Sequence, residues 1–150
     1  MSFTTVSGYA HDNGYQLVIV IAGTTRNLLS QATGRLRNDL STDGPSRRWE
    51  VYTSDDPDFR NNDPSGIRVN LLRWTDPSIP DSDRRTVLIT VMKQHTHLDR
   101  VCDVLEQLDL QLDLQNVPAL IFDDEADQAS LNIEVQRWMS EAGVNFFSGI

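Results

Sequence analysis

Residues 124–127, Asp-Glu-Ala-Asp, carry carboxylates in a pattern that suits phosphate chemistry, because they follow directly on the apolar segment 117–122 and Asp123. A carboxylate at the end of a buried strand, such as Asp124, can hold Mg²⁺ through its water shell. A neighbouring glutamate, Glu125, can orient the water that attacks a phosphoryl group. An acidic helix start is the competing interpretation, since acidic side chains favour the first turn of a helix.

A second group of polar residues, Thr24, Thr25 and Arg26, follows the apolar segment 16–22 and Gly23. Either threonine can cap a following helix, whose free N–H groups bind anions such as a nucleic-acid phosphate. Arg26 would add a cation at the same place. Taken alone, this segment is better explained as an ordinary capped helix with a surface arginine.

The segments that must position these residues alternate between two patterns. Continuous apolar runs at 16–22, 86–92 and 117–122 predict buried strands of a parallel sheet covered on both faces. Helical patterns are expected at 2–13 and after each of the three strands, the last of them near 131–142. The apolar stripes of the two central helices are Leu28, Leu29, Ala32, Leu36 and Leu40, then Leu98, Val101, Leu105 and Leu108. This order predicts an α/β fold.

Residues 41–85 interrupt the alternation of strands and helices. They hold five of the six prolines and two short strand-like pieces, 49–53 and 67–72. A long polar insertion between core strands is usually a functional loop or a small hairpin. We therefore expect a loop-rich insertion within one domain that spans residues 1–150.

Composition narrows the class of protein. The 150 residues suffice for one domain, and their net charge of −9 repels phosphate, so any nucleic-acid contact must be local. A single cysteine, Cys102, fits a reducing compartment and is expected in or near the core. No run reaches the roughly 18 apolar residues of a membrane helix, and the N-terminus lacks signal-peptide features. We expect a cytoplasmic protein without a membrane partner.

Two motifs together give the chain a specific resemblance. Residues 25–31, Thr-Arg-x-Leu-x-x-Gln, are similar to the nucleic-acid-contacting motif after the second core strand of superfamily-two helicases. Residues 124–127 have the DEAD form of their Walker B motif. In detail, segments 17–24 and 119–130 resemble most closely the ATPase core of the bacterial Z-one domain proteins, which are labelled as endonucleases. Segment 91–98 is similar to a later strand-to-helix junction of the same family. The resemblance covers most of the chain except about residues 41–85.

The resemblance implies both a fold and residue roles. The fold would be a three-layer sandwich with a mainly parallel sheet, the first RecA-like lobe of a P-loop ATPase. Asp124 would engage Mg²⁺ and ATP, Glu125 would activate water, and Asp127 would couple the nucleotide site to neighbouring motifs. Thr25 and Arg26, with Thr24 beside them, would lie along the nucleic-acid backbone, which we expect to be DNA. Asp123 departs from the family pattern, which usually has an apolar residue there, so either aspartate could face the metal.

A phosphate loop is missing from the sequence, since no G-x-x-x-x-G-K-[ST] occurs. We therefore expect a partial chain of an ATP-dependent nucleic-acid motor from a restriction or defence system, which alone binds ATP poorly and hydrolyses none. Its sheet would expose an apolar edge that favours association.

The main alternative is a non-catalytic interaction module that keeps the fold. A receiver-like domain ranks low, because Lys93 precedes the acidic cluster. His95 and His97 lack further nearby ligands and make a poor metal site.

Overall fold

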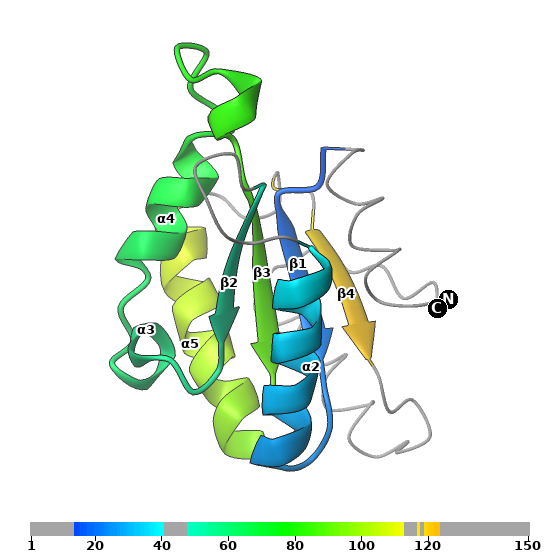
Figure 1. The fold of residues 1–150 in the computed structure, drawn as a ribbon. Helices are drawn as coiled ribbons and strands as arrows, with labels where there is room; N and C mark the ends of the chain where they lie inside the picture. Colours follow the sequence, from blue (N-terminus) through cyan, green and yellow to red (C-terminus); the bar gives the residue numbers. More distant parts are fainter. Residues whose placement is uncertain (1–13, 41–47, 113–116, 118, 124–150) are drawn as a thin grey trace.

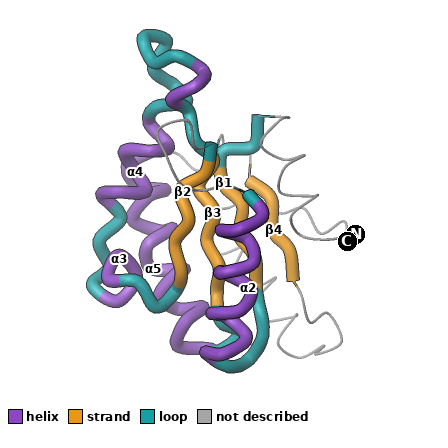
Figure 2. Tube along the Cα trace, in the orientation of Figure 1, coloured by secondary structure: helices purple, strands orange, loops and turns teal. Residues whose placement is uncertain are grey.

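A computed structural model describes residues 14–40, 48–112, 117 and 119–123 (Figure 1). At least one helix separates each strand from the next along these residues, as Figure 2 shows. The strands are β1 (Leu17–Ile21), β2 (Trp49–Thr53), β3 (Thr86–Val91) and β4 (Ala119–Asp123). The helices are α2 (Arg26–Asp39), α3 (Pro57–Arg60), α4 (Ser65–Leu72) and α5 (His95–Leu112), with a 3-10 turn, η1, at Asp81–Asp83. The predicted α/β class is confirmed.

The sheet is parallel throughout, and its strand order is β2-β3-β1-β4. Ile21 lies opposite Val91 on β3 and opposite Asp123 on β4. The carboxyl ends of these strands therefore meet at one edge, which is where ligands bind in open α/β sheets. At that edge Ala22 N–H donates to the carbonyl of Val91 at 2.9 Å, which continues the pairing beyond β1.

Helices cover both faces of the sheet (Figure 1). Alternate side chains of a strand point to opposite faces, so every strand residue of β1 and β3 is buried. On one face, α3, α4 and α5 pack against Leu17, Ile19, Ile21 and their neighbours on β3. On the other face, α2 packs against Val18, Val20 and Leu88 through Leu36. This two-sided burial explains why the strands read as continuous apolar runs.

The apolar stripe predicted for α5 is confirmed, because Leu98, Val101, Leu105 and Leu108 are all buried. Cys102 is buried beside them, as expected. The stripe predicted for α2 is partly wrong. Leu29 and Leu36 are buried, and Ala32 and Leu40 pack partly buried against the core, but Leu28 is 40% exposed. The polar Thr33 takes a core position that the apolar pattern did not include.

The insertion contains more regular structure than its composition indicated. The strand expected at 49–53 is present as β2, which pairs with β3 at the outside of the sheet. The strand expected at 67–72 is wrong, because this segment belongs to α4. Ile67 and Leu71, four residues apart, face the core, whereas Val69 is 52% exposed. Helical spacing buries these apolar residues better than the apparent alternation at 67, 69 and 71 would.

The helices expected at 2–13 and 131–142 lie outside the described residues, as do Asp124, Glu125 and Asp127. The finer prediction of a RecA-like three-layer core is therefore not decided by the part of the chain that the structure describes. Within that part, no helix is both long and apolar enough to span a bilayer.

Candidate functional site

The loop after β1 places Arg26 at the sheet's carboxyl edge. Gly23 has φ +64°, a left-handed conformation that glycine adopts readily, and it turns the chain into α2. Thr25 is the N-cap of α2, and its hydroxyl accepts the N–H of Leu28 at 3.2 Å. The predicted capping role is thereby confirmed for Thr25. Thr24 is partly exposed, and Arg26 begins the helix with its side chain in solvent.

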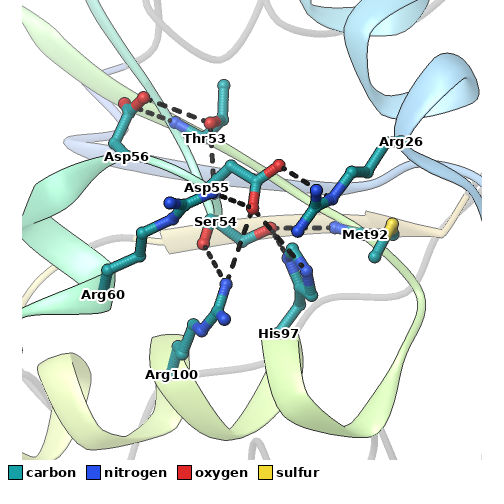
Figure 3. Close-up of polar contacts among 9 residues, drawn as sticks. All are labelled: Arg26, Thr53, Ser54, Asp55, Asp56, Arg60, Met92, His97 and Arg100. Carbon is teal, nitrogen blue, oxygen red and sulfur yellow. Dashed lines mark hydrogen bonds and ion pairs between the residues drawn. The ribbon is translucent and has the colours of Figure 1, made fainter.

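The end of β2 contributes the centre of a charged cluster, which we call the Asp55 cluster: Asp55, Arg26, Arg60, Arg100 and His97 (Figure 3). Arg60 donates a hydrogen bond to Asp55 Oδ1 at 3.2 Å. Arg100 lies 3.6 Å from the same oxygen, and Arg26 lies 3.6 Å from Oδ2. Three guanidinium groups from α2, α3 and α5 thus converge on one carboxylate.

Solvent reaches the cluster unevenly. The side chains of Arg26 and Arg60 are 68% and 50% exposed, whereas those of Arg100 and Asp55 are 27% and 25% exposed. Burial acts to raise the pKa of Asp55, but the hydrogen bond from Arg60 and the charge of Arg26 outweigh it, so the pKa lies below its usual value. Asp55 is therefore ionised at neutral pH.

His97 forms the buried floor of the cluster. Its Nδ1 lies 2.7 Å from the hydroxyl of Ser54, and its Nε2 lies 3.8 Å from Asp55 Oδ1. The carboxylate favours the tautomer with its proton on Nε2, so Nδ1 accepts the hydrogen bond from Ser54. Burial, and next the charge of Arg100, lower the pKa of His97. The imidazole is therefore neutral at pH 7.

Ser54, His97 and Asp55 combine the residue types of a hydrolase triad, but their positions exclude that chemistry. The side chain of Ser54 is completely buried, so no substrate can reach its hydroxyl. That hydroxyl also accepts the N–H of Met92 at 3.2 Å. A nucleophile needs access to the reacting carbonyl or phosphorus. These three residues instead join the ends of β2 and β3 to α5.

A pocket of about 350 Å³ opens beside the cluster, between α2 and the end of β2. Its α2 wall has helical spacing and consists of Arg26, Leu29, Ser30, Thr33, Gly34 and Arg37. Its other wall consists of Thr53, Asp55 and Asp56. The carboxylate of Asp56 accepts both the N–H and the hydroxyl of Thr53, at 2.9 and 3.2 Å. The pocket is polar, with a cation at each end of its helical wall.

The remaining predicted site residues separate into two groups. His95 is exposed and His97 is buried, and no group of three or more side chains that could hold a metal ion occurs among the described residues. Asp124, Glu125 and Asp127 lie outside the described residues, so their roles stay predictions. The backbone of Asp123, the residue before the acidic motif, ends β4 opposite Ile21 at the carboxyl edge.

Comparison with known proteins adds no further assignment: no family model, curated protein or solved structure matches this chain.

Proposed function

We propose that this chain is part of an ATP-dependent nucleic-acid motor, a helicase or translocase that acts on DNA in the cytoplasm. The observation that carries the proposal is the register of β4 on β1, which pairs Asp123 with Ile21. Asp123, which precedes the acidic motif, and Ile21, which precedes the loop of Thr24, Thr25 and Arg26, therefore end their strands at one edge of the sheet. Ligands of open α/β sheets bind at this edge, so it supports a nucleotide site and a nucleic-acid contact close to each other.

In this proposal the two groups of residues have separate tasks. Asp124 would hold Mg²⁺ through water, Glu125 would position the attacking water, and Asp127 would connect the nucleotide site to the rest of the lobe. Arg26 and the capped start of α2 would contact phosphates of the strand. The sheet would belong to a RecA-like three-layer core. A phosphate loop would have to come from elsewhere in the parent protein, because this sequence has no such motif.

The second candidate is a non-catalytic interaction module that binds nucleic acid or protein. The observation that favours it is the Asp55 cluster, whose arginines form a cationic surface without any need for ATP. Both candidates use the same edge of the sheet, and only the first requires hydrolysis.

An ATPase assay on the parent protein, with its phosphate loop present, separates the two candidates. We expect turnover that single-stranded DNA stimulates and that Glu125→Gln abolishes while ATP binding is retained. Equal turnover in the Glu125→Gln variant would remove the motor assignment. DNA binding without any ATP hydrolysis would establish the interaction module instead.

A further inference from the structure

Three arginines with one carboxylate between them form an arrangement that a phosphate can enter. We propose that Arg26, Arg60 and Arg100 bind a backbone phosphate of single-stranded nucleic acid, and that Asp55 occupies this site until the phosphate replaces it. The identity of the strand rests on the proposed function; the affinity for a phosphate rests on the cluster alone.

The geometry leaves room for a better partner than Asp55. Only Arg60 lies within hydrogen-bond distance of the carboxylate, at 3.2 Å, while Arg26 and Arg100 remain at 3.6 Å. Each guanidinium group can donate two parallel N–H hydrogen bonds. The two oxygens of one carboxylate are too few to accept such a pair from each of three guanidinium groups. A phosphate offers more acceptor oxygens, arranged around a tetrahedral centre. It can therefore accept hydrogen bonds from several arginines at once.

The local charge favours an anion even though the whole chain carries −9. The three arginines outnumber the two nearby carboxylates, Asp55 and Asp56, of which Asp56 accepts two hydrogen bonds from Thr53. The N-terminus of the 14-residue helix α2, where Arg26 begins, adds the positive end of a helix dipole. Twelve of the thirteen basic residues in the chain are arginine, the side chain suited to forked phosphate contacts.

The pocket beside the cluster indicates an extended ligand. Its helical wall runs from Arg26 to Arg37, which corresponds to about 16 Å of helix. Small polar positions lie between these two residues, among them Ser30, Thr33 and Gly34. A single free phosphate would use only the end near Asp55, whereas a strand could continue along the helix. The exposed Arg26 and Arg60 leave the entrance open to such a strand.

A purely structural role for the cluster makes the opposite prediction for one variant. If Asp55 serves only to tie α2 and α3 to the sheet, Asp55→Asn should lower stability and leave nucleic-acid binding absent or unchanged. If Asp55 competes with phosphate, the same change should tighten binding, because the negative group that holds the arginines is gone. The sign of the change in affinity therefore distinguishes the two roles.

The test is fluorescence anisotropy of a labelled oligo-dT strand with the 150-residue chain, titrated at several salt concentrations. We expect Arg60→Ala and Arg100→Ala each to weaken binding about tenfold and to lower the slope of log affinity against log salt by about one. Arg60→Lys should retain the slope but lose part of the affinity, because lysine keeps the charge without the fork. Asp55→Asn should bind more tightly than the wild type.

Two arginines serve as matched controls. Arg35 lies on α2 nine residues after Arg26, on about the opposite side of the helix, and is exposed. Arg68 is exposed on α4. Arg35→Ala and Arg68→Ala remove the same charge and should change the affinity less than twofold. Circular dichroism of every variant identifies any that fails to fold. If Asp55→Asn does not fold, Arg60→Lys replaces it as the deciding variant.

The outcomes separate this inference from the proposed function. Wild-type affinity and salt slope in Arg60→Ala and Arg100→Ala would overturn the phosphate site, even if the parent protein hydrolyses ATP. DNA binding that depends on the cluster, in a parent protein with no ATPase activity, would support the site and overturn the motor. Protection by inorganic phosphate against thermal unfolding, without any binding of the strand, would overturn the nucleic-acid assignment.

Discussion

The hydroxyl of Ser54 lies 2.7 Å from Nδ1 of His97, in a position closed to solvent. These residues are 43 apart in the sequence, and their contact joins the end of β2 to the first turn of α5. The same hydroxyl accepts the N–H of Met92 after β3. One serine therefore connects three segments at the carboxyl edge of the sheet, and the positions of Asp55 and Arg100 depend on it.

Ser54→Ala should destabilise the protein by about 2 kcal/mol, because it leaves Nδ1 of His97 and the N–H of Met92 buried without a partner. Urea unfolding monitored by tryptophan fluorescence measures the change. Ser30→Ala, at an exposed position of α2, is the control and should not reduce stability. An equal effect of the two substitutions would show that the buried hydroxyl contributes nothing.

The stability of the protein should decrease as the pH falls below about 6.5, because His97 is buried and neutral in the folded chain. Its folded-state pKa is lowered, so the unfolded chain binds the proton more readily and gains population in acid. His97→Asn, which keeps an acceptor near Ser54, should flatten the dependence between pH 6.5 and the lowered folded-state pKa, whereas the exposed His95→Gln should retain it. Urea unfolding at successive pH values provides the measurement, and identical slopes in both variants would contradict the role of His97.

Asp55 should add a separate loss of stability at lower pH. Its pKa in the folded protein lies below the usual value near 3.8. The contribution of ionised Asp55 to folding stability is therefore complete above the usual carboxyl pKa, and it is lost as the pH falls through the folded-state pKa. The partners Arg26 and Arg60 are half exposed or more, so we expect this step to be small. Asp55→Asn should remove the step, which acid titration of the far-ultraviolet circular dichroism signal can detect.

The core strands could be predicted from sequence because their pattern is local. An unbroken apolar run such as residues 17–21 has few stable positions other than a sheet covered on both faces. Segment 67–72 was mistaken because Ile67, Val69 and Leu71 fit a strand, while Ile67 and Leu71 also fit a helix. Short segments allow both periods, and tertiary packing decides between them.

The Asp55 cluster could not be predicted from spacing, since its members come from α2, the turn after β2, α3 and α5. Partial signals were present. Ser54 and Asp55 follow a strand-like segment, as Thr24 and Arg26 follow another, and parallel strand ends meet at one edge. His97 and Arg100 are three apart and share a helix face. The prolines and polar residues of 41–85 indicated a loop-rich insertion, so the residues that follow the expected strand at 49–53 were not considered as a site.

Gly23→Ala should cost at least about 2 kcal/mol in stability, because two effects add. The φ of +64° disfavours any side chain, and a Cβ at this position would overlap Cβ of Leu28. Gly14→Ala is the matched control, since Gly14 has φ +81° and open space around it. The control should lose only the conformational part, about 1 kcal/mol. Equal losses in denaturant unfolding would show that Leu28 moves aside at no cost.

Gly34→Ala should stabilise the protein by about 0.5–1 kcal/mol, since Gly34 lies inside α2 and a Cβ there would meet nothing within 4 Å. The urea midpoint should rise while its slope with denaturant stays constant. A larger side chain makes this position a probe of the pocket as well, because Gly34 lines the wall between Arg26 and Arg37. Gly34→Leu should keep the helix yet fill part of the pocket, so it should bind oligo-dT more weakly than Gly34→Ala. Equal affinities of these two variants, both folded, would mean that the strand does not follow α2 beyond the Asp55 cluster.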